Sequence, residues 1–214
     1  MNSFLSLYHR SFAVRLCVGF LAAATLLGVL GLFTTNSHLI VPHFDEYVRL
    51  KVQSIASANV TAAMGILTRL GSTLGLTALG MVVIGFFLYM RRLKYIGLLL
   101  LVMAGQGILQ FGFKEIFERQ RPQAMFDYVI GDTPSFPSGH SIAATCFFGL
   151  LAYLISLEVK FTSRKFAVCA LAVVIILTVG FSRVYFDVHY PSDVVAGYLA
   201  GVIWASSVAS GARS

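Results

Sequence analysis

The stretch Ser182-Arg183-Val184-Tyr185-Phe186-Asp187-Val188-His189-Tyr190-Pro191-Ser192-Asp193 lies between two apolar runs of the chain. Charged groups in such a place are costly unless they serve a function. His189 and Asp193 are four residues apart, so helix geometry would let the carboxylate accept the imidazole N–H and leave the other ring nitrogen unprotonated and nucleophilic. Arg183 adds a planar cation suited to phosphate or carboxylate. Taken alone, the pair has an equally common alternative, a solvated pair at a helix start.

The composition identifies a membrane protein. The chain has 214 residues, of which 57% are hydrophobic and 12% charged, about half the charged fraction of a soluble domain. The net charge is +7, but the cations are scattered between apolar runs, which argues against nucleic acid and favours anionic membrane lipids as partners. Nothing divides the chain, so we expect one domain over residues 1–214.

The apolar runs predict an all-α fold, a six-transmembrane helix bundle. The first run, which Arg10 and Arg15 flank, is too long for a signal peptide and is interpreted as a retained helix. Gly197 and Gly201 predict close helix packing in the last span. The expected spans are about 13–33, 74–90, 95–113, 139–157, 166–183 and 192–208.

Short interfacial amphipathic helices are expected between the first and second spans. Phe44, Tyr47, Val48, Val52 and Ile55 recur at helical spacing, opposite charged residues. The pattern repeats more weakly over 60–67, and neither segment is long enough to span a bilayer.

The distribution of cations predicts the orientation of the bundle. Six spans put nine cations on the side of the termini, and four on the other side once those of the candidate site are left out. The positive-inside rule then predicts cytoplasmic termini and an extracytoplasmic site.

Two further polar stretches fall on the same side as 182–193. Pro137-Ser138-Gly139-His140 precedes the apolar run 142–157, and a helix start of this kind attracts anions through free N–H groups. Lys114 and Arg121-Pro122 follow the run 95–113, and seven residues are nearly two helical turns, so both cations can face one way until Pro122 ends the helix. The alternatives are an ordinary turn and cations that snorkel to the interface.

Together, Lys114-x6-Arg121-Pro122, Pro137-Ser138-Gly139-His140 and Ser182-Arg183-x5-His189-x3-Asp193 resemble the tripartite signature of the type-2 phosphatidic acid phosphatase superfamily, in its integral membrane branch. The resemblance implies that His189 attacks phosphorus to give a phosphohistidine, that Asp193 supports it, and that His140 serves as acid and then base. It implies phosphate binding by Lys114, Arg121, Ser138, Gly139 and Arg183, and supporting roles for Pro122, Pro137 and Ser182.

No cofactor and no metal are expected, because Asp127 and Asp132 have no further ligand at site spacing and are interpreted as solvated loop carboxylates. The leading hypothesis is therefore a lipid phosphate phosphatase in a bacterial cytoplasmic (inner) membrane, whose substrate reaches it from the bilayer. The resemblance favours undecaprenyl pyrophosphate or phosphatidylglycerol phosphate, with phosphatidic acid also a candidate. Two alternatives are a lipid-to-lipid phosphotransferase with the same site, and an anion transporter, which predicts internal repeats that the sequence does not display.

Overall fold

The computed structural model describes residues 2–35, 40–122 and 133–212, and the secondary structure in these ranges is helical. The elements follow one another along the chain as α1 (Asn2–Thr35), α2 (Ile40–Gln53), α3 (Ala58–Leu67), the 3₁₀ turn η1 (Thr68–Gly71), α4 (Thr73–Tyr89), α5 (Leu93–Phe117), α6 (Gly139–Glu158), α7 (Thr162–Tyr185) and α8 (Pro191–Ala209).

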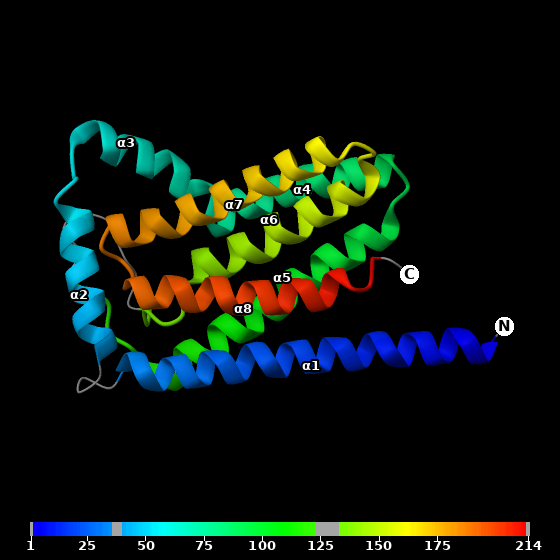
Figure 1. The fold of residues 1–214 in the computed structure, drawn as a ribbon, viewed down its shortest axis with the longest axis horizontal. Coiled ribbons are helices and arrows are strands. Elements are labelled where there is room, and N and C mark those ends of the chain that lie inside the picture. The colour runs from blue at the N-terminus through cyan, green and yellow to red at the C-terminus, as the bar shows by residue number, and fades with distance from the viewer. Residues whose placement is uncertain (1, 36–39, 123–132, 213–214) are drawn as a thin grey trace.

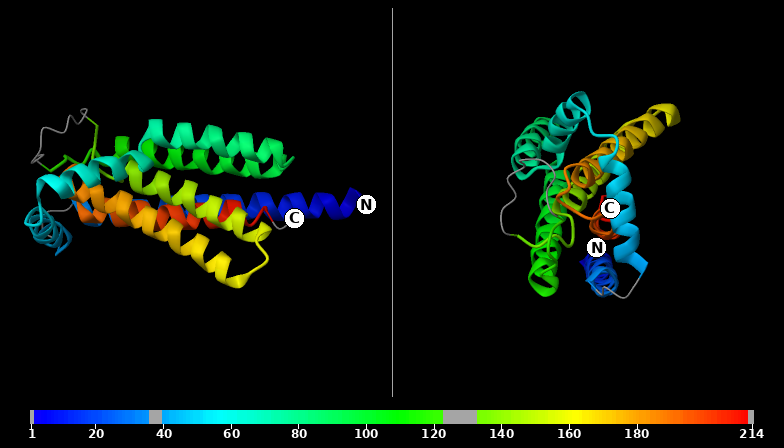
Figure 2. Two further views of the ribbon diagram at one scale, coloured as in Figure 1. Left: turned by 90° about the horizontal axis from the view of Figure 1, so that it is seen from above. Right: turned by 90° about the vertical axis from the view of Figure 1, so that its left-hand side faces the viewer.

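The long helices run up and down in one bundle (Figure 1). The start of α1 and the end of α8 lie at one end, whereas the α7–α8 turn, the start of α6 and the end of α5 lie at the other. α6 is central, with α4 and α5 on one side of it and α7 and α8 on the other (Figure 2). The chain order therefore brings the three polar stretches of the sequence to one end of the molecule.

Among the described residues, five helices are each long and apolar enough to cross a membrane: Ser11–Thr35, Leu93–Phe117, Gly139–Glu158, Thr162–Tyr185 and Pro191–Ala209. A sixth span is complete if Ala58–Gly71 and Thr73–Tyr89, which meet at a bend of 55°, count as one broken span. The predicted all-helical membrane fold is confirmed.

The segment after α2 differs from the expected second interfacial helix. α3 continues through η1 to Ser72, whose side chain caps α4 by accepting from the N–H of Gly75 at 3.0 Å. α3 also packs against α7, where Thr61 Oγ1 and the Tyr185 hydroxyl are 2.7 Å apart. α3 and η1 therefore join α4 at a bend of 55° to form an apolar pair.

Small residues hold α6 and α8 together, as the Gly197 and Gly201 spacing predicts. A Cβ at Gly197 would lie 3.0 Å from the Ser138 carbonyl oxygen, and one at Gly201 would lie 2.7 Å from the Thr145 Cβ. About one turn further along α8, the indole N–H of Trp204 donates to the Val102 carbonyl of α5 at 2.9 Å. α6 and α8 thus form a tightly packed base for the polar end of the bundle.

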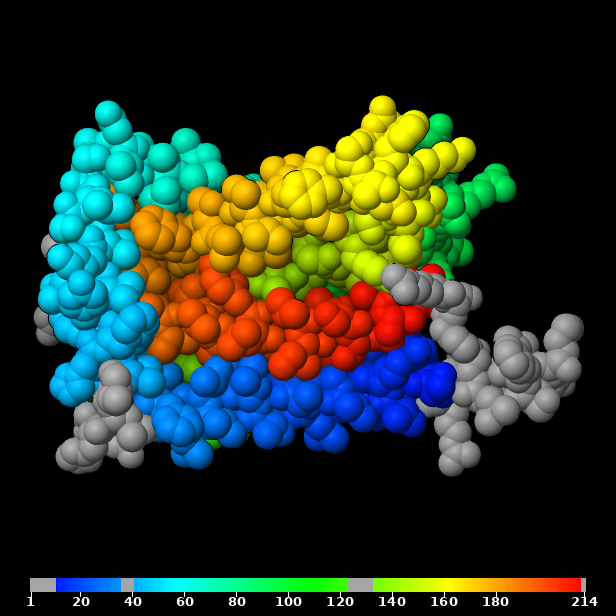
Figure 3. Space-filling model, in the orientation of Figure 1, coloured from blue at the N-terminus to red at the C-terminus, as the bar shows by residue number. Residues whose placement is uncertain are grey.

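Helix α2 crosses that end (Figures 1 and 3), and two of its charged residues pair with carboxylate or guanidinium groups of other elements. Asp45 is completely buried, whereas Phe44 and Tyr47 are about 60% exposed (57% and 62%). The helical period of α2 is as predicted, but two of its charged residues, Asp45 and Arg49, contact other parts of the protein where the periodicity indicated solvent. A hydrophobic period alone does not reveal which of two faces meets the protein.

Candidate active site

The turn between α7 and α8 places His189 at the polar end of the bundle. Helix α7 ends at Tyr185, and the carbonyl of Arg183 then accepts the N–H groups of Val188 and His189 at 3.1 and 3.3 Å. Asp187 has a left-handed backbone (φ 57°), which reverses the chain direction between the two helices. The turn is therefore fixed by its own backbone hydrogen bonds.

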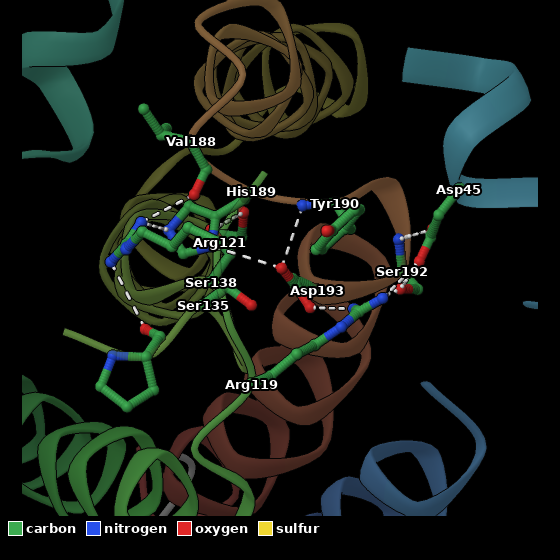
Figure 4. A network of polar contacts seen from close by, with 12 residues as sticks. Asp45, Arg119, Arg121, Ser135, Ser138, Val188, His189, Tyr190, Ser192 and Asp193 are labelled. Carbon is green, nitrogen blue, oxygen red and sulfur yellow. Dashed lines mark hydrogen bonds and ion pairs between the residues drawn. The ribbon is translucent and has the colours of Figure 1, made fainter. Parts of the chain in front are cut away.

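His189 lies between a carboxylate and a guanidinium (Figure 4). Its Nδ1 faces Asp193 Oδ2 at 3.5 Å, longer than a normal hydrogen bond, and its Nε2 lies 3.3 Å from Arg121 Nη1. The ring is 3% exposed. The expected pairing is present, but α8 begins only at Pro191, so an N-terminal cap and not a continuous helix brings the two residues together.

The surroundings favour neutral imidazole. Burial lowers the pKa of His189 to about 4, and the positive charges of Arg121 and Arg183 add to this effect while Asp193 opposes it. At neutral pH one ring nitrogen therefore carries a lone pair. Because Nε2 faces a donor N–H of Arg121, the contact favours the tautomer with the proton on Nδ1, toward Asp193.

Asp193 is fixed by residues that the sequence analysis did not assign to the site. Its Oδ1 accepts from Arg119 Nη1 at 2.5 Å, and its Oδ2 accepts from the N–H of Tyr190 at 3.0 Å. Arg119 also lies over the Tyr190 ring, 4.1 Å from its centroid. Arg119 thus orients the carboxylate that faces His189.

The same guanidinium connects the site to α2. Arg119 Nη2 donates to Asp45 Oδ2 at 2.8 Å, and Asp45 also accepts from the backbone N–H of Ser192 at 2.8 Å. The Ser192 hydroxyl donates to Asp45 and accepts from Arg119. One buried guanidinium therefore bridges two buried carboxylates from opposite ends of the sequence (Figure 4).

A second ion pair joins α2 to the α7–α8 turn. Arg49 Nη1 donates to Asp187 Oδ2 at 2.7 Å, and Gln53 Nε2 donates to the same oxygen at 2.8 Å. Below them, Val52 packs against the buried cluster of Tyr185, Phe186 and Val188. Two side chains of α2, those of Arg49 and Gln53, therefore hold the α7–α8 turn through Asp187.

Lys114 and Arg121 converge on the segment before Pro137, although not from one helix as expected. α5 ends at Phe117, and Glu118 adopts a left-handed backbone (φ 42°), so Arg121 lies on an irregular segment. The ammonium of Lys114 donates to the Pro134 carbonyl, and Arg121 Nε donates to the Thr133 carbonyl at 2.7 Å. Arg121 also donates to the Val188 carbonyl at 2.7 Å, next to His189. The helix stops before Pro122 because the chain turns at Glu118.

Arg183 is 95% buried (5% exposed), and its Nη1 donates to Thr68 Oγ1 of η1 at 2.8 Å. Ser182, expected to hydrogen-bond within the site, instead donates to the Val179 carbonyl of its own helix at 2.5 Å. Ser182 therefore hydrogen-bonds within the last turns of α7, whereas the side chain of Arg183 extends into the site.

The start of α6 carries His140 into the site, with one difference from expectation. The backbone N–H of Ser138, expected to bind phosphate, donates to the Asp193 carbonyl at 3.1 Å, and its side chain is buried against Ser141. Pro137 is buried beside it in a cis peptide bond with Phe136. The helix start therefore joins α6 to α8, and Gly139 and His140 are the residues of this stretch that reach the cavity.

A cavity of about 760 Å³ opens next to these groups. Five basic residues line its polar end, Lys114, Arg121, His140, Arg183 and His189, and Glu115 also lines the cavity. Of the eleven signature residues, these five basic residues and Gly139 line the cavity, whereas Asp193, Ser138, Ser182, Pro122 and Pro137 do not. Three cations and two imidazoles around one cavity suit a phosphate group.

The comparison with protein families identifies the family to which the chain belongs. The model of the PAP2 superfamily matches residues 94–212, which include all three polar stretches. The chain belongs to the PAP2 superfamily. A search of solved structures agrees: a crystal structure described as the first transmembrane PAP2 type phosphatidylglycerolphosphate phosphatase from Bacillus subtilis superposes with a TM-score of 0.80, at 30% identity, over 91% of this chain and 96% of that one.

Other PAP2 relatives vary in how much of the chain they match. Phosphatidylglycerophosphatase B of Bacillus subtilis is 35% identical over 162 residues, 74% of this chain and 78% of the relative. A lipid A 1-phosphatase of Rhizobium etli is 36% identical over 104 residues, 44% of this chain and 40% of the relative. The crystal structure of Aquifex aeolicus LpxE shares the fold with a TM-score of 0.57, at 21% identity, over 78% of this chain and 94% of that one.

The described part of this PAP2 member contains no group of three or more His, Cys, Asp or Glu side chains arranged to hold a metal ion. Asp127 and Asp132, which the sequence analysis interpreted as loop carboxylates, lie outside the described residues. The expectation that no metal takes part stays a prediction.

Proposed function

We propose that this integral membrane PAP2 phosphatase hydrolyses a lipid phosphomonoester or pyrophosphate through a phosphohistidine at His189. The observation that carries the proposal is the position of Nε2: it belongs to a buried imidazole, faces Arg121 at 3.3 Å and lies at a cavity that Lys114 and Arg183 also line. A neutral nitrogen beside three cations can attack a phosphate whose negative charge those cations offset.

In the first step, Nε2 of His189 forms a bond to phosphorus while the bond from phosphorus to the lipid oxygen breaks. His140, in its protonated form, gives a proton to the departing oxygen. The positive charge that develops on His189 is stabilised by the carboxylate of Asp193, which Arg119 and the Tyr190 N–H hold in place.

In the second step, His140 takes a proton from water, whose oxygen attacks phosphorus. The bond between phosphorus and Nε2 then breaks, and inorganic phosphate leaves with the imidazole restored. Positioning and positive charge are what phosphoryl transfer chiefly requires. Lys114, Arg121 and Arg183 supply the charge from side chains, so we expect activity that survives EDTA.

The site is proposed to face away from the cytoplasm. The charge asymmetry supports this orientation, and it grows when Arg49 and Arg119 are discounted, because each pairs with a buried carboxylate. Single cysteines in a variant without native cysteines test it. A cysteine at Thr133, on the site side, should react with a membrane-impermeant thiol reagent in spheroplasts, whereas one at Arg164 should not. The reverse pattern would place the site in the cytoplasm.

A phosphate-release assay tests the activity itself. The purified protein, in micelles, is offered phosphatidylglycerol phosphate, phosphatidic acid and undecaprenyl pyrophosphate, and both free phosphate and phosphorylated lipid products are measured. We expect free phosphate from at least one lipid and none from His189→Ala. Phosphorylated lipid in place of phosphate would indicate a phosphotransferase, and wild-type turnover by His189→Ala would overturn the mechanism.

A further inference from the structure

A second cavity, of about 570 Å³, lies on the side of α6 that faces away from the catalytic cavity. The two cavities share no lining residue. Phe147 lines the catalytic cavity, whereas Gly149 lines the second one, and two residues are about 200° apart around a helix. Atoms of α6 are visible between α7 and α8 in Figure 3, at the floor of the second cavity. This cavity is called the α7–α8 groove below.

The α7–α8 groove is present because α7 and α8 touch near the active site and diverge toward the end that carries the chain termini (Figures 1 and 2). Where they touch, the Tyr198 hydroxyl lies 3.1 Å from the Ile176 carbonyl oxygen, and a Cβ on Gly180 would lie 1.9 Å from that hydroxyl. Further along α8, Val202 and Ser206 line the groove and are exposed. This side of α8 is therefore left uncovered by α7.

The floor of the groove is open and lies within the membrane-spanning part of the bundle. A Cβ added to Gly149 would meet no atom within 4 Å. Thr145 and Tyr153, four residues before and after it, also line the groove, so the floor extends about 12 Å along α6. The walls are mostly apolar, with Val173 and Ile176 from α7 and Val202 and Ala205 from α8. A hydrocarbon chain fits a space of this length and polarity.

The end of the groove nearest the chain termini is polar. Arg15 of α1 lines it there, level with the last turns of α8, because a Cβ on Gly19 would lie 1.8 Å from Ser207 Oγ. Arg15 is exposed and forms no ion pair with any residue that the structure describes. The Ser206 hydroxyl likewise makes no hydrogen bond within the described part of the chain. A guanidinium and a hydroxyl with unused donors suit a phosphate group at the membrane surface.

The charges at this end favour a lipid over a second copy of the chain as the occupant. Among the described side chains, Glu158 is the one acidic group at this end, and it is already paired with Arg92 at 2.7 Å. The described part of a second copy would therefore bring no unpaired carboxylate to Arg15. Lys160 and Arg164 are exposed near the start of α7, at the same end, and add to the positive charge that attracts anionic lipids.

We propose that the α7–α8 groove binds an anionic phospholipid from the leaflet on the side of the chain termini. One acyl chain lies on the floor formed by α6, and the phosphate lies at Arg15 and Ser206. This lipid is not a substrate: its site faces away from His189, on the opposite side of α6, and takes a phosphodiester lipid as readily as a phosphomonoester. Binding there does not require turnover, so the inference stands or falls separately from the proposed function.

Two photoactivatable lipids test the site, phosphatidylglycerol and phosphatidylcholine with the same diazirine-bearing acyl chain. The purified full chain, in nanodiscs of unlabelled phosphatidylcholine with a trace of one probe, is irradiated, and the labelled peptides are mapped. In wild type, we expect label on the α6 and α8 residues of the groove, about fivefold higher with phosphatidylglycerol. This ratio is the contribution of one cation at a membrane surface.

Arg15→Gln should lower that ratio to about one. Arg164→Gln is the matched control, because it removes the same charge at the same end from a residue outside the groove, and it should keep the ratio. Gly149→Leu should fill part of the floor and reduce labelling of the groove by both lipids. Size-exclusion chromatography and circular dichroism check that each variant is folded.

Equal labelling of the wild-type groove by the two lipids would overturn the proposal, as would a ratio that Arg15→Gln leaves unchanged. A chemical cross-linker that joins groove peptides of two copies, with no lipid label there, would assign the groove to a dimer and would also overturn it.

Discussion

The two walls of the cavity are built in different ways. The wall that carries His189 is fixed by buried hydrogen bonds and ion pairs, and the ring itself is only 3% exposed. The opposite wall includes α4, in which only Leu76 and Phe87 are buried and Met81 is 64% exposed. The difference indicates that one wall holds reacting groups in a single geometry, whereas the other accepts flexible chains. Changes in the first wall should lower kcat, and changes in the second should alter substrate preference.

The largest effect short of removing the nucleophile is expected from Asp193→Asn. The amide preserves shape but removes the charge that supports a phosphorylated, cationic imidazole and can favour the wrong tautomer. By analogy with catalytic triads, kcat should fall by about 10³- to 10⁴-fold, with the purified variant still folded by circular dichroism. A loss below tenfold would mean that Asp193 only caps α8.

A smaller loss is expected from Arg119→Gln, which removes the group that orients Asp193. Because small displacements of catalytic groups cost up to about 10²-fold, kcat should fall by 10- to 100-fold with little change in KM. Arg119→Lys should recover only part of the lost kcat, since an ammonium lacks the planar set of N–H groups with which a guanidinium bridges two carboxylates.

Arg49→Gln is the matched control for Arg119→Gln. Arg49 makes the other ion pair between α2 and the turn, through Asp187, and does not contact Asp193. Its loss should reduce thermal stability while kcat stays within a few-fold of wild type. Equal kcat losses in the two variants would indicate that α2 acts only as a structural support.

The protonation state of His189 gives a test without turnover. A buried imidazole whose pKa is lowered to about 4 stays neutral as pH falls, and it gains a proton only near that value. Nitrogen-15 NMR of histidine-labelled protein in bilayers, with His189→Asn to identify the signal, should find it neutral at pH 5. Imidazolium at pH 6 would contradict the environment described for this wall.

The smallest effect is expected in the open wall. Gly80 of α4 lines the cavity, and a Cβ there would meet Phe147 at 3.7 Å, an ordinary contact. Gly80→Leu should fill part of the space for a chain and raise KM for a dioleoyl substrate by about tenfold. A short-chain substrate should keep wild-type kinetics. Reduced kcat for both would show that the two walls are not independent.

The sequence was sufficient for the helices and for the basic residues at the polar end of the cavity. Apolar runs mark the spans, and the spacing of Gly197 and Gly201 predicts close helix packing, for which the structure supplies α6 as the partner. Arg119 and Asp45 were missed because their contact joins residues 74 positions apart, which local periodicity cannot detect. Arg119 lies between Lys114 and Arg121, and that position was the one available signal. The contact of the Ser138 N–H with the Asp193 carbonyl was not foreseen, because a helix start can donate to protein as readily as to phosphate.

Trapping the phosphorylated intermediate tests the central claim most directly. The enzyme is mixed with lipid carrying ³²P in its phosphate, quenched in alkali, which preserves a bond between phosphorus and histidine nitrogen, and digested for peptide mapping. We predict label on the peptide that contains His189, its release by acid, and no label in His189→Gln. Label on His140, or full turnover in His189→Gln, would contradict the account.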